Sequence, residues 1–281
     1  MNNYLEEQKP TPIPFVEIRN VYKAFPTQPN AQSVPAVQDV SLLIPHQEEG
    51  DFVAFLGPSG CGKSTLLQMI SGLLPPDKGE VYALGKEVAG PDAQSVTVQQ
   101  AYTCFPWLSV LGNVEFGLKV HGASGVERRK IATEYLQKVG LGDRLDANPR
   151  QLSGGMQQRV AIARTLAMRL PIVLMDEPFG ALDAQTRADM QEMLLSLWQA
   201  ENNLVVFVTH DISEALLLAN RIIVFSSRPA RIVYDMQVPF ERPRPQSLLY
   251  DSQFLKLSQV LVGLLKHSET AFTNSTAKSG N

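Results

Sequence analysis

The feature that most restricts the fold of this chain is a short glycine-rich loop between an apolar run and a helical pattern. The loop reads Gly-Pro-Ser-Gly-Cys-Gly-Lys-Ser over residues 57–64 and directly follows the apolar run 52–56. The spacing G-x-x-x-x-G-K-[ST], placed after a buried strand and before a helix, indicates a cradle for a polyphosphate. Glycines let backbone N–H groups close around phosphate oxygens, and the helix start adds partial positive charge.

We expect the residues of this loop to bind a nucleotide together. Lys63 would supply a point charge toward the β- and γ-phosphates, and Ser64 would offer a hydroxyl ligand to Mg²⁺. The predicted cradle comprises Gly57, Pro58, Ser59, Gly60, Cys61, Gly62, Lys63, Ser64 and Thr65. Cys61 occupies a free position of the pattern, where any small residue would serve. A thiol reagent is nevertheless expected to block binding there, and ATP to protect the thiol.

Apolar runs of strand length recur along the chain and alternate with helical patterns. Strands are expected at 15–25, 52–56, 81–84, 172–175, 204–208 and 222–225, and helices at 63–72, 184–200 and 212–219. Residues 108–170 are richer in helical patterns, and a polar loop is expected at 26–35. The alternation predicts an α/β fold with an open parallel sheet and helices on both faces.

Two of the apolar runs end in polar residues suited to nucleotide hydrolysis. Asp176 and Glu177 follow one run, and His210 follows another. Side chains at the carboxyl ends of parallel strands face the ligand crevice of such a sheet. Asp176 is therefore placed to hold Mg²⁺, and Glu177 to orient and polarise the attacking water. His210 would contact the γ-phosphate and link it to Glu177.

The composition narrows the class of protein. Of 281 residues, 44% are hydrophobic and 19% charged, and the formal net charge of −3 disfavours a nucleic-acid binder. No stretch reaches the roughly 18 apolar residues that span a bilayer, and residues 1–14 lack the pattern of a secretory signal. Cys61 and Cys104 do not make a disulfide framework and favour a reducing compartment. Work at a membrane would need other chains to do the spanning.

The segment 152–159 points to one family. Its sequence, Leu-Ser-Gly-Gly-Met-Gln-Gln-Arg, resembles the LSGGQ-type signature of the ABC ATPases, with Met156 at the last position of the core motif. Ser153 can cap a helix whose first N–H groups, together with Gly154 and Gly155, present an anion site. The resemblance implies that this site faces the γ-phosphate held by a partner subunit. Since one chain carries each half of the site once, two subunits are expected to pair head to tail around two ATP molecules.

The resemblance assigns roles to further residues. Gln100 is similar to the Q-loop glutamine that touches Mg²⁺ and the attacking water, with its neighbour Gln99 as the alternative. Asp183, at the end of Ala-Leu-Asp, resembles the D-loop residue. Phe25 occupies the place of the family's aromatic that stacks on adenine, and Tyr22 is a second candidate.

The resemblance also implies an arrangement of domains. Residues 15–246 would form a P-loop NTPase core of the RecA-like type, with a mostly parallel sheet and an N-terminal antiparallel β subdomain. A helical subdomain would be inserted at about residues 101–170. After a Pro-rich elbow, a helix is expected at 247–266, and the segments 1–14 and 267–281 are expected to be disordered.

Two surface features bear on partners. Trp107, Leu108 and Val110 are similar to the region that, in this family, lines a groove for a coupling helix of the membrane subunit, and packing within the helical lobe explains them equally well. The run 177–184 resembles bacterial importers. The elbow around 243–245 and the short C-terminal helix resemble the nitrate, sulfonate, taurine and bicarbonate import group.

The expected function is ATP hydrolysis that powers a bacterial importer of a small solute, such as one of these anions, at the cytoplasmic face of the inner membrane. Lys63, Gln100, Glu177 and His210 would be catalytic, and Ser64, Gln100 and Asp176 would hold the metal. The partners would be two transmembrane permease subunits, a second ATP-binding subunit and, indirectly, an external solute-binding protein.

Other functions remain as alternatives. The main one is the ATPase of a lipid-extracting or exporting complex. A soluble ABC ATPase of DNA repair or translation would carry two cassettes or a long coiled coil, and this chain has neither. The signature helix disfavours a phosphotransferase, and the presence of Lys63, Asp176, Glu177 and His210 disfavours an inactive cassette.

Overall fold

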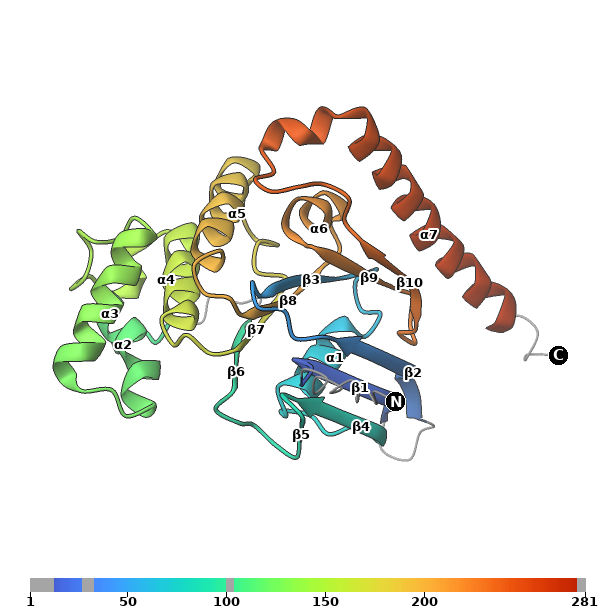
Figure 1. The fold of residues 1–281 in the computed structure, drawn as a ribbon, viewed down its shortest axis with the longest axis horizontal. Helices are drawn as coiled ribbons and strands as arrows, with labels where there is room; N and C mark the ends of the chain where they lie inside the picture. The colour runs from blue at the N-terminus through green and yellow to red at the C-terminus, as the bar shows by residue number, and fades with distance from the viewer. Residues whose placement is uncertain (1–12, 27–32, 100–103, 277–281) are drawn as a thin grey trace, which may run out of the picture.

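The computed structural model describes residues 13–26, 33–99 and 104–276. Two sheets, a group of helices at one end and a long C-terminal helix make up the molecule (Figure 1). Most of the expected N-terminal segment 1–14 lies outside the described residues, as does Gln100.

The larger sheet has the strand order β10-β9-β3-β8-β7-β6. Its parallel strands are β3 (Asp51–Leu56), β6 (Ser95–Val98), β7 (Ile172–Asp176), β8 (Leu204–Thr209) and β9 (Arg221–Phe225). Every residue of β3 and β8 is buried, which explains why these runs are apolar without alternation. The predicted parallel sheet is confirmed.

Alternate residues of β3 pack into two different hydrophobic clusters. Phe52, Ala54 and Leu56 belong to the cluster with the helical part of the molecule. Val53 and Phe55 belong to the cluster with α1 (Lys63–Ile70) and the second sheet. The central strand is thus covered on both faces, and the chain that leaves its carboxyl end starts from a rigid support.

The smaller sheet is antiparallel and has the order β2-β1-β4-β5. Its strands are β1 (Val16–Pro26), β2 (Ser33–Ile44), β4 (Lys78–Ala83) and β5 (Lys86–Glu87). The loop expected at 26–35 is therefore too long, because β2 already begins at Ser33. Register shifts along β1 interrupt the pairing with β2, so the alternation that marks a strand is broken in the sequence as well.

Three helices form the helical part of the fold: α2 (Val110–Val120), α3 (Gly125–Lys138) and α4 (Gly154–Leu166). Each begins after a serine whose side chain accepts a hydrogen bond from a backbone N–H of the first turn, which stabilises the helix start. A short 3₁₀ turn, η1 (Pro149–Gln151), leads into α4. The boundaries lie within the region expected to be helical.

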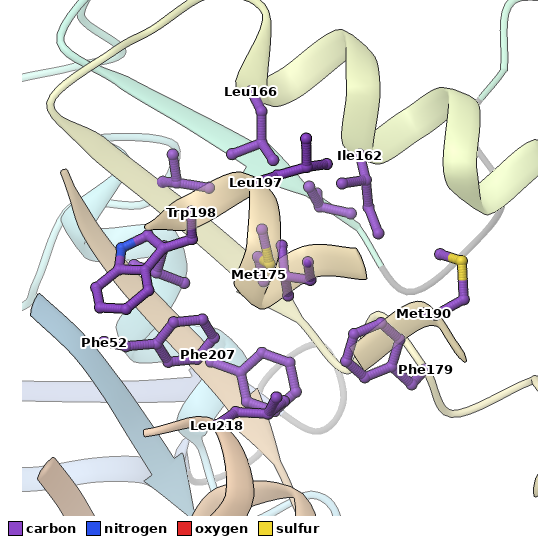
Figure 2. Packing of buried hydrophobic residues seen from close by; sticks show 14 of the residues in the cluster. Phe52, Ile162, Leu166, Met175, Phe179, Met190, Leu197, Trp198, Phe207 and Leu218 are labelled. Carbon is purple, nitrogen blue, oxygen red and sulfur yellow. The ribbon is translucent and has the colours of Figure 1, made fainter. Parts of the chain in front are cut away.

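Aromatic packing fixes α5 (Ala184–Trp198) and α6 (Ile212–Leu218) against the larger sheet. Figure 2 shows the rings of Trp198, Phe52, Phe207 and Phe179 in a row. Their centroids are 5.5 Å apart for Phe52 and Trp198, and 5.7 Å apart for both Phe52–Phe207 and Phe179–Phe207. Because Phe179 is fully buried two residues after Glu177, this packing also fixes the segment that carries the acidic pair.

The C-terminal part differs from the expectation in three ways. Strand β10 (Ile232–Gln237) was not predicted; it is a mostly exposed edge strand, antiparallel to β9. A 3₁₀ turn, η2 (Gln246–Tyr250), occupies the expected helix start, and α7 (Ser252–Thr276) begins where Asp251 accepts hydrogen bonds from the N–H groups of Gln253 and Phe254. The helix continues past residue 266 because the following residues to Thr276 include no glycine or proline, so the tail expected to be disordered is helical to that point.

Two arginines of the Pro-rich elbow bind the carboxyl end of α6. Arg244 Nη1 donates to the carbonyls of Leu216 at 3.0 Å and Ala219 at 2.6 Å, and Arg242 Nη2 donates to the carbonyl of Leu218. Burial lowers the pKa of each guanidinium to about 10. The positive charges lie at the negative end of the helix and satisfy carbonyls that would otherwise have no partner.

Within the described parts of the chain, no helix has the length and apolarity needed to cross a membrane.

Candidate nucleotide-binding site

The glycine-rich loop leaves β3 at its carboxyl end and leads into α1. Gly60 and Gly62 adopt φ values of +73° and +122°, which favour glycine. A Cβ at Gly62 would lie 2.4 Å from the carbonyl oxygen of Ala36, so a larger residue would push the loop away from β2. The loop is therefore held close to the smaller sheet by its own glycines.

Lys63 is buried at the first position of α1. Its Nζ donates to the carbonyls of Gly57 and Pro58, both at 2.8 Å, and so bends back across the loop. The ammonium group thus lies at the centre of the loop, beside the helix start, where an anion would meet both positive charges.

A cavity of about 210 Å³ opens beside the loop. Its lining combines glycines and side chains of the loop with Glu177 and with residues of β1 and β2: Phe25, Ala36, Gly60, Gly62, Lys63, Ser64, Thr65, Glu177 and Arg228. Phe25 thus lines the cavity beside the loop, and its stacking on adenine stays a prediction. Tyr22, the alternative, is not among the residues that line this cavity.

Asp176 and Ser64 meet although they are far apart in the sequence. Ser64 Oγ donates to Asp176 Oδ1 at 2.8 Å. Burial raises the pKa of Asp176, and the hydrogen bond from Ser64 opposes that shift. A hydroxyl and a carboxylate oxygen at this distance are donors that suit Mg²⁺, which in nucleotide sites uses few protein ligands and completes its shell with water and phosphate. The residues present therefore fit the metal.

Glu177 and His210 form a second polar pair. Glu177 Oε2 lies 3.1 Å from His210 Nδ1, and the backbone of Glu177 has a φ of +43°. Such a conformation costs a non-glycine residue roughly 1–3 kcal/mol. The hydrogen bond from its N–H to the carbonyl of Val208, at 3.0 Å, helps to hold it. His210 is half exposed, so it can turn toward a ligand in the crevice.

The signature segment forms a separate helix start. Ser153 Oγ accepts from the N–H of Met156 at 3.3 Å, and Gly154 and Gly155 are the first residues of α4. None of the three lines the cavity around Lys63 among the residues that the structure describes. The structure therefore confirms the predicted cap but does not bring this segment to the phosphate loop of its own chain.

Asp183 lies next to the signature helix, at the start of α5. Its side chain accepts from the N–H of Thr186 at 3.0 Å and from the hydroxyl of Thr186 at 2.7 Å, and these bonds lower the pKa of the exposed carboxyl. A Cβ on Gly155 would lie 2.8 Å from Thr186 Cγ2. The close approach of the two helix starts therefore requires glycine at position 155.

The chain is similar to proteins of one family over almost its whole length. The model of the family described as "ABC transporter" matches residues 37–180. An uncharacterized ABC transporter ATP-binding protein of Methanocaldococcus jannaschii is 46% identical over 89% of this chain and 91% of its own. The nitrate import ATP-binding protein NrtD of Synechocystis is 44% identical over 87% and 93%, and a taurine import ATP-binding protein of Chromobacterium violaceum is 44% identical over 82% and 89%.

This chain belongs to the ABC transporter family. A solved structure of the ATP-binding cassette MJ0796, a dimer in a post-hydrolysis state bound to ADP and Pi, matches with a TM-score of 0.69 and 36% identity. The match covers 80% of this chain and all of that one. The expected ABC cassette fold is thus confirmed.

The segment that corresponds to the Q-loop of ABC proteins is described only in part. Gln100 lies outside the described residues, so its predicted role stays a prediction. Its neighbour Gln99 is exposed and lines a second cavity, of about 440 Å³, together with Thr97 and Asp176. The segment therefore leaves β6 beside the carboxylate that fits the metal.

The structure separates the residues of the expected coupling groove. Val110 is fully buried, so packing explains it, whereas the side chain of Trp107 is 74% exposed. The ring of Trp107 stacks on Phe105, and Phe105 contacts Phe116, which is also exposed. An aromatic surface thus lies at the start of the helical part of this ABC cassette.

Sequence reasoning missed two residues of the nucleotide cavity, Ala36 and Arg228. The guanidinium of Arg228 donates to the carbonyls of Pro35 and Val34, which holds the start of β2 beside the site. Arg228 follows β9, whose carboxyl end lies at the same edge of the sheet as those of β3, β7 and β8. That strand-end position was the available signal. Ala36 gave none, because β2 itself was not predicted.

Proposed function

We propose that this chain is the ATP-hydrolysing subunit of an importer for a small oxyanion. The observation that carries the proposal is the convergence of Lys63, the Ser64–Asp176 pair and the Glu177–His210 pair at one edge of the sheet. This set provides a phosphate site, a metal site and a base beside them. It is what phosphoryl transfer to water requires, since such a reaction depends on positioning and charge stabilisation.

Each residue has a defined task in this proposal. Lys63 and the N–H groups of the loop bind the β- and γ-phosphates, while Phe25 stacks on adenine. Glu177 orients the attacking water and accepts its proton, and His210 holds Glu177 and the γ-phosphate in register. Ser64, Asp176 and Gln100 hold Mg²⁺, which when bound neutralises the charge that develops on the β- and γ-oxygens.

The second ATP-binding subunit completes the site. Ser153, Gly154 and Gly155 lie apart from the cavity around Lys63, yet they form the start of α4, which is suited to an anion. Asp183 caps the neighbouring start of α5. A head-to-tail pair of subunits would place this helix start opposite the γ-phosphate of its partner. The dimeric state of the similar cassette MJ0796 supports this arrangement.

The proposed cargo follows from the relatives. Two of them are named as import proteins for nitrate and taurine, and both solutes carry an oxyanion group. The chain would work at the cytoplasmic face of the membrane, bound to two permease subunits that form the path for the solute. An external binding protein would deliver the solute to them.

A phosphate-release assay on the full-length chain tests the ATPase part. With ATP and Mg²⁺ the wild-type chain should release phosphate, and Glu177→Gln should lower the turnover by roughly a hundredfold or more while keeping ATP bound. Glu192→Gln, an exposed acid on α5, is the matched control and should match the wild type. Equal turnover of Glu177→Gln and the control would reject the assigned role.

A second assay tests the import part. Membranes that contain this chain with its permease subunits would be supplied with nitrate, taurine or bicarbonate and the binding protein. Stimulation of ATP hydrolysis by one anion supports the proposal and names the cargo. Rapid hydrolysis that no anion changes would contradict an importer, while leaving the ATPase part intact.

A further inference from the structure

Arg187 connects the segment that ends at Asp183 with the segment that carries His210. It lies in the first turn of α5, and its Nη2 donates to the carbonyl of Leu182 at 3.0 Å. Leu182 is buried, so this carbonyl belongs to a part of the chain whose position is set by the core. One end of the guanidinium is therefore tied to the segment that resembles the D-loop.

The other side of the guanidinium faces two carboxylates. Nη1 lies 3.9 Å from Asp211 Oδ2, and Nε lies 3.8 Å from Glu214 Oε1. Both distances allow electrostatic attraction but exceed that of a hydrogen bond. Nε is buried and has no hydrogen-bond partner within the described part of the chain. A small movement that brings an acceptor to such a buried donor lowers the free energy of the protein.

Glu214 anchors the backbone on both sides of His210. Its buried carboxylate accepts from Thr209 Oγ1 at 2.7 Å and from Gln191 Nε2 at 3.3 Å. Thr209 Oγ1 in turn accepts from the N–H of Asp211 at 3.0 Å. The residues before and after His210 are thus joined to one carboxylate. Burial raises the pKa of Glu214, and the positive charge of Arg187 opposes that shift.

We propose that Arg187 is a positioning residue that couples the position of the D-loop segment to that of His210. A shift of about 1 Å would bring Nε into hydrogen-bond distance of Glu214. Movement of Leu182 and Asp183, such as the arrival of a second subunit would cause, moves Arg187 between the Leu182 carbonyl and the two carboxylates. The His210 segment follows through Glu214 and Thr209, and with it the contact to Glu177. The inference rests on the proposed ATPase function.

A purely structural role makes a different prediction. If Arg187 only stabilised α5, without acting through Glu214, its loss would lower the melting temperature. The losses of Arg187 and Glu214 would then multiply in their effects on turnover. If Arg187 acts through Glu214, the effects of the two substitutions on turnover overlap, because either substitution alone already breaks the contact between the two residues.

The test is a double-mutant cycle on the full-length chain with Arg187→Gln, Glu214→Gln and both together. We expect Arg187→Gln to lower kcat roughly tenfold with KM for ATP within about twofold, and Arg187→Lys to recover part of kcat. The double variant should be several-fold more active than the product of the single effects predicts. Arg144→Gln, which alters an exposed arginine beside Asp143, is the control and should match the wild type.

The outcomes separate this inference from the proposed function. If wild-type chain releases no phosphate, or if Glu177→Gln matches it, the ATPase proposal fails. If wild-type chain is active but Arg187→Gln behaves like Arg144→Gln, or if the effects of Arg187 and Glu214 multiply, the coupling role is wrong. Loss of melting temperature without the overlap in kcat would also reject it.

Discussion

The two segments of this chain that are predicted to bind anions, the loop before α1 and the start of α4, both pair glycines with a helix start but differ in what surrounds them. The loop before α1 lies beside a cavity lined by the buried Lys63, the carboxylate of Glu177 and the ring of Phe25. The start of α4 is a capped helix end with two glycines, and its Ser153 is exposed. The first segment is complete within one chain, whereas the second has only donors. This difference is the basis of the proposed head-to-tail pairing, in which the second segment would act on a ligand held by another subunit.

The largest expected effect concerns the loop before α1. Lys63→Ala removes the only side-chain ammonium in the lining of the described cavity, and we expect ATP affinity and turnover to fall by roughly a hundredfold or more. Isothermal titration and phosphate release measure the two quantities. Lys86→Ala, an exposed lysine of β5, is the control. If Lys63→Ala kept the ATP affinity of the wild type, the loop before α1 would not be the phosphate site that we describe.

The next largest effect concerns the start of α4. Gly155→Val adds atoms where a Cβ already lies 2.8 Å from Thr186 Cγ2, so it should displace the start of α4. Turnover should fall by roughly a hundredfold, because small misplacements at a reacting centre are costly, while the affinity of the isolated subunit for ATP stays unchanged.

Gly125→Val is a matched control for this variant. Gly125 also begins a helix after a capping serine, but a Cβ there would meet only Arg128, at 3.7 Å. We expect the start of α4 to serve turnover but not ATP binding by its own chain. Weaker ATP binding by Gly155→Val, or equal turnover of both variants, would contradict this.

A smaller effect distinguishes the two aromatic candidates. Phe25→Ala should weaken ATP binding about tenfold, because stacking on a base is worth roughly 1–3 kcal/mol. Tyr22→Ala should leave the affinity within about twofold, because Tyr22 does not line the cavity. Titration of both variants with ATP decides between them, and the reverse order of effects would transfer the adenine site to Tyr22.

The smallest effect concerns Cys61. Its side chain is almost fully buried, and burial raises the pKa of the thiol. We therefore expect alkylation of Cys61 in the folded chain to be roughly tenfold or more slower than in the unfolded chain, and slower than that of the half-buried Cys104. Mass spectrometry of timed samples measures both rates. Rapid modification that ATP prevents would support the sequence-based expectation of an accessible thiol instead.

Much of the site was predictable because its signals are local. The glycine-rich loop, the acidic pair and His210 each follow an apolar run, and parallel strands bring their carboxyl ends to one edge. The 2.8 Å contact of Ser64 with Asp176 follows from that geometry, although the residues are far apart in the sequence. The resemblance to the family added Ser153, whose predicted cap the structure confirms, and Asp183, which the structure shows to cap α5.

What the sequence did not reveal depends on long-range packing. Register shifts interrupt the pairing of β1 with β2, and β10 is a mostly exposed edge strand, so neither β2 nor β10 was predicted. Only the second half of β2, from Val40 to Ile44, alternates regularly between buried and exposed residues. Ala36 lines the cavity because β2 places it there, whereas Arg228 lines it because it follows β9 and contacts the start of β2. The length of α7 was underestimated because polarity was taken as a sign of disorder, while helix continuation depends on the absence of residues that break it.

The elbow arginines set the smallest piece of the chain that can be expected to fold on its own. Arg242 and Arg244 fill the carbonyls at the end of α6, and Arg242 also lies over the ring of Trp198 in α5. The family model matches only to residue 180. A truncation before residue 242 would nevertheless remove the partners of the α6 carbonyls and of the Trp198 ring at the edge of the core. For expression and engineering, the functional unit therefore extends through Arg244, well beyond the last strand of the parallel sheet.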